Sequence, residues 1–242
     1  MGEHGQYRNL VRSAALFAAL FAATPAAACR LALVLALDVS SSVDEIEDQL
    51  QRGGLVSALT APEVQAAFFA VEAPVALAAF EWSGRYNQEV VLDWTIIDSP
   101  AALLRAAETI AASKRSHNEF PTAMGYALGF GSEMLRRAPN CLRQIIDMAG
   151  DGENNEGFGP RLAYREYDFD DVTVNGLVVN AAEFASETML IEFYRNEVLW
   201  GAGAFMEVAQ GFEDYERAMR RKLERELTPP MIGALPLIRD AG

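Results

Sequence analysis

The chain has 242 residues, which is enough for one sizeable hydrophobic core or two small ones. Its composition, 51% hydrophobic and 22% charged residues, excludes a disordered chain and a coiled coil. A formal net charge of −14 leaves no electrostatic attraction for nucleic acid or anionic lipid. Two histidines and two cysteines are too few for most zinc sites and for a disulfide-dense mini-protein.

The first 28 residues have the pattern of a secretory signal peptide. Two arginines precede a short apolar run over residues 14–23, and small residues follow it up to Ala28. The apolar run is about half as long as a bilayer-spanning helix. We therefore expect cleavage after Ala28, which leaves residues 29–242 as a single periplasmic or secreted domain without a transmembrane segment. An uncleaved anchor is the alternative, because apolar residues resume at Leu31.

The first half of the remaining chain predicts three strands and a helix. A continuous apolar run over residues 31–37 is typical of a strand buried on both faces. Helical spacing over residues 43–59 follows, with acidic residues in the first turn, where they favour a helix start. Strands over residues 75–82 and 89–97 are separated only by the turn at residues 83–87. Such a short link predicts a hairpin, and therefore one antiparallel edge strand.

The second half continues to alternate between helices and strands. The pattern predicts helices over residues 100–114, 122–137, 188–198 and 213–227, and strands over residues 143–149, 172–179 and 204–209. Residues 158–171 contain several acidic and tyrosine residues, and we expect them to form a long solvated loop. Regular alternation of the two element types predicts an α/β fold with a mostly parallel six-stranded sheet.

Polar residues follow two of the strongest predicted strands. Asp38, Ser40 and Ser42 come directly after the first strand, in the sequence D-V-S-S-S. Asp151 lies between two glycines after the strand over residues 143–149. In open parallel sheets ligands bind outside the carboxyl ends of the strands, so these side chains meet at one rim if the two strands are neighbours. Carboxylates and hydroxyls without His or Cys form a hard oxygen set, which suits Mg²⁺ or Mn²⁺.

Together with Thr122, these residues resemble the metal-ion-dependent adhesion site of the von Willebrand factor type A (vWA) domain. That family carries D-x-S-x-S after the first strand, a Thr in a later loop before a helix, and a Gly-Asp pair after the fourth strand. The resemblance covers residues 30–227, and the chain is similar to exported bacterial vWA-like proteins of unassigned function. It implies a doubly wound sheet with helices on both faces and one antiparallel edge strand.

The resemblance also implies a role for each residue of the site. Ser40 and Ser42 would coordinate the cation directly. Thr122 would bind it directly or through water, and Asp38 and Asp151 would act through bridging waters or directly. An Asp or Glu of a partner protein would fill the free position, because without the cation two acidic groups from different molecules would repel each other. We therefore expect an exported, metal-dependent protein-binding module and not an enzyme, with its partner and oligomeric state unidentified.

Each part of the motif also has a simpler interpretation. Serine-rich turns and a threonine before a helix are common helix N-caps, and Asp151-Gly152 is an ordinary turn. Two other functions remain open, a metal-assisted hydrolase at the same rim and a domain whose metal only holds loops together. A hydrolytic triad would need His117, the only histidine after residue 28, and no G-x-S-x-G sequence is present. We expect His117 to be a solvated loop residue that borders the rim.

The two cysteines lie at similar distances before the two acidic residues. Cys29 precedes Asp38 by nine residues, and Cys141 precedes Asp151 by ten. If the two strands are parallel neighbours with level acidic ends, both cysteines lie at the opposite rim within bridging distance. We expect a Cys29–Cys141 disulfide, which suits an oxidising compartment. Two free thiols, or a lipid-modified Cys29, are the alternatives.

Overall fold

The computed structural model describes residues 29–180 and 184–228, so the expected signal peptide lies outside the described residues. Its six strands are β1 (Leu31–Asp38), β2 (Val75–Trp82), β3 (Gln88–Ile97), β4 (Gln144–Gly150), β5 (Val172–Val179) and β6 (Met206–Ala209). They form one sheet in the order β3-β2-β1-β4-β5-β6. Only β3 runs antiparallel to its neighbour, which confirms the predicted edge strand.

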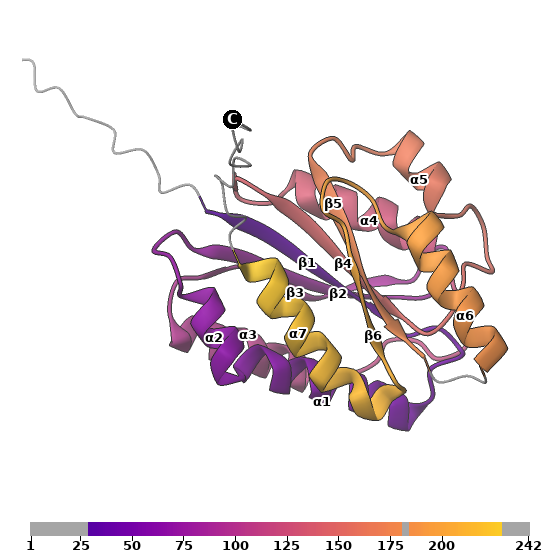
Figure 1. Cartoon of the computed structure of the whole chain (residues 1–242), viewed down its shortest axis with the longest axis horizontal. Coiled ribbons are helices and arrows are strands. Elements are labelled where there is room, and N and C mark those ends of the chain that lie inside the picture. Colours follow the sequence, from indigo (N-terminus) through magenta and orange to yellow (C-terminus); the bar gives the residue numbers. More distant parts are fainter. Residues whose placement is uncertain (1–28, 181–183, 229–242) are drawn as a thin grey trace, which may run out of the picture.

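Helices cover both faces of this sheet, as the resemblance implied (Figure 1). On one face lie α1 (Glu45–Thr60), α2 (Pro62–Phe68), α3 (Pro100–Ala112) and α7 (Tyr215–Leu227). On the other lie α4 (Met124–Arg136), α5 (Pro160–Glu166) and α6 (Phe184–Phe193). Short 3₁₀ and π-helical segments, Phe212–Asp214 and Tyr194–Val198, adjoin α7 and α6. No helix in the described part of the chain has the length and apolar character needed to cross a membrane.

Strand β1 is central because its apolar run can be buried from both sides. All eight of its residues are buried. Leu33 and Leu35 pack into the core under α1 and α7, whereas Val34 and Ala36 pack into the core under α4. A residue that ends this strand is therefore held at the carboxyl rim by two packed layers.

Three segments differ from the sequence predictions. The expected loop over residues 158–171 is wrong, because Pro160 starts helix α5 and Tyr164 is buried against Trp200, with 4.6 Å between ring centroids. Helix α2 was not expected from the sequence. The helix expected over residues 188–198 starts earlier and ends in the π-helical turn, where Tyr194 is fully buried against Gly176. A β-carbon at Gly176 would lie only 2.7 Å from the Tyr194 ring, so this glycine makes room for the ring.

The Cys29–Cys141 disulfide is present, as predicted. The parallel register of β1 and β4 pairs Ala32 with Gln144 and continues back to a bridge between the two cysteines. Their Cα atoms are 4.4 Å apart. The bond therefore joins the two central strands at the rim opposite to Asp38.

Candidate metal centre

Asp38 ends β1 and organises the loop that follows it. Its side chain is completely buried, and its Oδ1 accepts a hydrogen bond of 2.8 Å from the Ser40 backbone N–H. This side-chain bond to the residue two positions on is typical of a tight Asx-type turn. On the other side, Gln51 Nε2 of α1 donates to the Asp38 carbonyl at 2.9 Å. These two hydrogen bonds hold the turn from both sides.

The serines in this loop do not cap helix α1. Asp44 is its N-cap, and the Asp44 side chain accepts from the Glu47 N–H at 2.8 Å. The Glu47 carboxylate in turn accepts from the Asp44 N–H at 2.7 Å, which completes a capping box. The capping interpretation of the D-V-S-S-S turn is therefore wrong, and the hydroxyls of Ser40 and Ser42 are available for another role.

The side chains predicted to form the site come together in one hydrogen-bonded network. The Ser40 and Ser42 hydroxyls are 3.1 Å apart. Thr122 Oγ1 donates to Ser40 Oγ at 3.2 Å, and Ser42 Oγ donates to Asp151 Oδ1 at 2.7 Å. With Asp38 bonded to the Ser40 backbone, five oxygen-bearing side chains from three separate loops are linked at the carboxyl rim of the sheet.

Thr122 is held in place by the loop after β4 rather than by the helix that follows it. The residue before α4 is Ala123, which makes no side-chain cap. The Thr122 N–H donates to Asn155 Oδ1 at 2.9 Å, and the Thr122 carbonyl accepts from the Asn155 N–H at 3.0 Å. Asn155 therefore positions Thr122 toward Ser40, a role that sequence analysis missed. The only signal for it was a polar Asn-Asn pair shortly after the acidic turn.

Burial disfavours the ionised forms of both carboxyl groups of the site, and the charge of Asp151 adds to this effect at Asp38. Burial, followed by the charge of Asp151, raises the pKa of Asp38 to about 7, against hydrogen bonds from Ser40 and the charge of Arg115. Burial also raises the pKa of Asp151, against the hydrogen bond from Ser42. A cation between the two carboxyl groups would stabilise their ionised forms and so lower both pKa values.

One oxygen of Asp38 lacks any polar partner in the described part of the chain. Asp38 Oδ2 is buried and accepts no hydrogen bond there. Gly150 packs so closely that a β-carbon at this position would lie 2.7 Å from Oδ2. Since buried charged oxygens are normally paired, a cation beside Oδ2 could supply the partner that this atom lacks among the described residues.

The donor atoms at this rim indicate which kind of cation they could bind. Among residues 29–180 and 184–228, no group of three or more His, Cys, Asp or Glu side chains is placed so that it could hold a metal ion. A metal at this rim would therefore depend on hydroxyl oxygens as well as on the two carboxylates. Such an all-oxygen set fits a hard divalent cation such as Mg²⁺ or Mn²⁺.

Arg115, which sequence analysis also missed, binds the backbone of the loop after β1, residues 39–42, called the metal loop below. Its Nη2 donates to the carbonyls of Val39 and Ser40, at 3.0 and 2.9 Å. Its Nε donates to the His117 carbonyl at 2.6 Å. The half-buried His117 ring packs edge-on against Phe120, with centroids 5.1 Å apart, and makes no hydrogen bond within the described residues. The described residues therefore include no serine–histidine pair at this rim.

The doubly wound sheet with one antiparallel edge, and this loop arrangement at its carboxyl rim, define a vWA-type fold. The chain belongs to the family described as "Protein of unknown function (DUF1194)", whose sequence profile matches residues 28–231. A comparison with curated proteins finds no significant match.

Solved structures of vWA proteins share the fold at low sequence identity. Proximal thread matrix protein 1 from the mussel byssus is 15% identical, with a TM-score of 0.58, over 83% of this chain and 48% of that chain. A von Willebrand factor type A protein from Catenulispora acidiphila is 14% identical, with a TM-score of 0.57, over 83% and 43%. The pilus adhesin SpaC from Lactobacillus rhamnosus GG is 12% identical, with a TM-score of 0.60, over 82% and 30%. The present chain thus matches less than half the length of each of these proteins.

Proposed function

We propose that this protein is an exported protein-binding module that depends on a divalent cation, and that it is not an enzyme. Mg²⁺ or Mn²⁺ would be held by Asp38, Ser40, Ser42, Thr122 and Asp151, and an Asp or Glu of a partner protein would complete its coordination. The observation that carries this proposal is the convergence of these five side chains beside a buried carboxylate oxygen without a partner.

The donor set explains why a partner carboxylate would bind. Asp38 and Asp151 supply the only two negative charges among the five side chains, and the three hydroxyls are neutral. A divalent cation held this way is only just neutralised, and so it still attracts a further carboxylate. The cation's role is to supply positive charge at the rim of a chain whose net charge is −14.

Several observations support the rest of the proposal. Export is supported by the signal-peptide pattern before residue 29 and by the disulfide between the central strands. Mussel proximal thread matrix protein 1 has been solved with a zinc-occupied MIDAS motif, and SpaC is a pilus adhesin. A non-enzymatic role is supported by the position of His117, whose ring packs on Phe120 instead of on a rim hydroxyl.

Isothermal titration with Mg²⁺ and with Mn²⁺ tests the proposal directly. Wild-type residues 29–242 should bind one cation, and Asp151→Asn and Ser42→Ala should abolish or strongly weaken this binding. Asp98→Asn is the matched control, because Asp98 is an exposed carboxylate that follows β3, away from the rim. Circular dichroism should show all variants folded. A folded wild-type protein that takes up neither cation, or a folded Asp151→Asn variant with unchanged affinity, would contradict the proposal.

A further inference from the structure

The hydroxyl of Tyr194 lies close to Asp38, on the face of the sheet that α4 and α6 cover. Asp38 is on the same face of β1 as Ala36, because alternate residues of a strand point to the same side. Ala36 and Tyr194 belong to one hydrophobic core. A β-carbon at Gly150, the last residue of β4, would lie 2.7 Å from Asp38 Oδ2 and 3.0 Å from the Tyr194 hydroxyl oxygen. Both oxygens are therefore within 3.0 Å of one point beside Gly150.

Neither of these two oxygens has a hydrogen-bond partner in the described part of the chain. Both belong to fully buried side chains, and Oδ2 of an ionised Asp38 can only accept, whereas the Tyr194 hydroxyl can donate. A buried polar atom that stays unpaired loses its hydration without compensation. A phenylalanine would fill the place of the Tyr194 ring without leaving such an atom. An unpaired donor next to an unpaired acceptor indicates one hydrogen bond that satisfies both.

Tyr194 keeps its proton, so its hydroxyl is available as a donor to a carboxylate. Burial, followed by the charges of Asp38, Asp151 and Asp147, holds the pKa of the Tyr194 hydroxyl well above its usual value. Among these charges that of Asp38 has the largest effect, which agrees with the closeness of the two side chains beside Gly150. The hydroxyl is therefore protonated at neutral pH and can donate to ionised Asp38.

The surrounding backbone holds the Tyr194 ring in this position. Tyr194 begins the π-helical turn, and its carbonyl accepts a hydrogen bond of 2.9 Å from the Leu199 N–H. Gly176 of β5 makes room for the ring, and Gly150 makes room for the hydroxyl. The φ angle of Gly150 is not positive, so its backbone conformation does not itself require glycine. Two close approaches at glycines and a π-helical turn, a feature frequent at functional sites, therefore bring this hydroxyl to Asp38.

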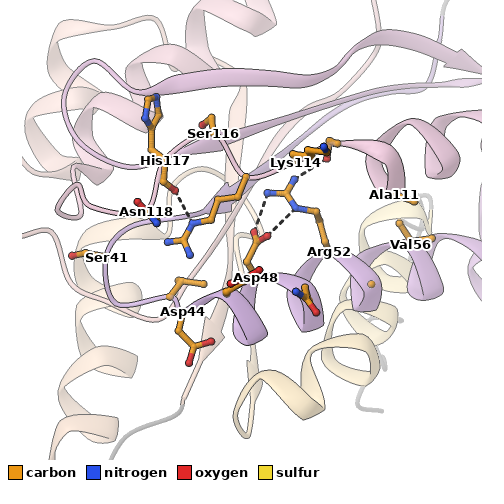
Figure 2. Close-up of a pocket in the computed structure, with 16 residues that line it drawn as sticks. Ser41, Asp44, Asp48, Arg52, Val56, Ala111, Lys114, Ser116, His117 and Asn118 are labelled. Atoms are coloured by element: carbon orange, nitrogen blue, oxygen red, sulfur yellow. Dashed lines mark hydrogen bonds and ion pairs between the residues drawn. The ribbon is translucent and has the colours of Figure 1, made fainter.

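On the other side of the metal loop, toward α1, the buried charged groups bind one another or the backbone. Arg52 binds Asp48 at 2.9 Å, as Figure 2 shows, and Glu81 at 2.7 Å. Arg115 donates to backbone carbonyls of the metal loop. None of these contacts involves Asp38 Oδ2, which is left to the side covered by α6.

We infer that Tyr194 is a positioning residue of the proposed metal centre, and that its hydroxyl donates a hydrogen bond to Asp38 Oδ2. The Ser40 N–H already holds Oδ1, so the second bond fixes the carboxylate at both oxygens and stabilises its ionised form. A carboxylate oxygen has two lone pairs, so Oδ2 can accept this bond and still face a cation. The inference rests on the proposed function and adds to it a residue from outside the recognised motif.

Isothermal titration with Mg²⁺ of two Tyr→Phe variants tests the inference. Tyr194→Phe removes only the hydroxyl and should weaken Mg²⁺ binding about tenfold or more, as loss of an outer hydrogen bond to a metal ligand does. Tyr215→Phe is the matched control, because Tyr215 is also fully buried with an unpartnered hydroxyl but lies in the core under α1 and α7. It should keep the wild-type affinity. A folded Tyr194→Phe variant with unchanged Mg²⁺ affinity would overturn the inference and leave the proposed function intact.

A double-mutant cycle in EDTA at pH 8 tests the same hydrogen bond without metal. In urea denaturation, Tyr194→Phe should lower the ratio of folded to unfolded protein about tenfold, because it removes a bond to a charged group. In the Asp38→Asn background the loss should be about threefold or less, since an N–H group then replaces the acceptor. Equal losses in both backgrounds would overturn the inference, because a packing role does not depend on the Asp38 charge. Unequal losses in a protein that takes up no Mg²⁺ would support the bond and refute the metal-dependent function.

Discussion

Replacing Asp38 with asparagine is expected to stabilise the metal-free protein and to remove most of the stabilisation that a divalent cation gives. Burial and the charge of Asp151 raise the pKa of Asp38 from 3.8 to about 7. A carboxyl with a higher pKa in the folded protein than in the unfolded chain binds its proton more tightly when the protein is folded. Without metal, the folded state is therefore most stable at low pH, and its free energy of unfolding falls as the pH rises from about 4 to about 7.

The pKa shift of Asp38 sets the size of this change in stability. At pH 8 the difference between the two pKa values corresponds to about 4 kcal/mol of lost stability. Asparagine removes this penalty and can still accept from the Ser40 N–H. Its amide N–H group would lie where Oδ2 now lacks a partner, which costs about 1–3 kcal/mol. In EDTA at pH 8 the Asp38→Asn variant should therefore be about 1–3 kcal/mol more stable than wild type.

Urea denaturation followed by tryptophan fluorescence measures both effects. At pH 4 in EDTA the Asp38→Asn variant should no longer be more stable than wild type, because wild-type Asp38 is then protonated in the folded state. At pH 8, Mg²⁺ at about 100 times its Kd should stabilise wild type by about 2.7 kcal/mol, and the variant should gain little. A stability difference that does not vary with pH, or equal stabilisation of both proteins by Mg²⁺, would refute the reasoning.

Two further predictions concern the scaffold. The double change Cys29→Ala and Cys141→Ala opens a covalent link across 112 residues and should cost about 4–5 kcal/mol in urea denaturation, so an unchanged midpoint would argue against the bond. Lys222 of α7 is fully buried and pairs with Asp147 at 2.5 Å and Glu226 at 2.6 Å. Lys222→Met should destabilise the protein by about 3–5 kcal/mol because it leaves buried carboxylates unpaired, and a loss below about 1 kcal/mol would contradict this account.

Much of the sheet could be predicted because its strands have a strong local pattern. The apolar run of β1 is continuous because both faces of that strand are covered, and the short hairpin link identifies β3 as antiparallel. Helix α5 was missed because Tyr164 and Tyr167 lie among acidic residues, a composition that suggests a solvated loop. Tertiary contacts, such as the packing of Tyr164 on Trp200 and on Phe169, make that segment part of the core.

The amino-acid sequence by itself determined the α/β class, the cysteine pair and the oxygen-bearing residues at the strand ends, since strand periodicity and the spacing of Asp38, Asp151 and the cysteines are local properties of the chain. Only the tertiary structure decided what those residues do. It assigned the α1 cap to Asp44, which released the serine hydroxyls, and it brought Arg115 against the metal loop from a distant segment. Such contacts depend on which strands are neighbours and on how loops pack at the rim, and no local pattern encodes them.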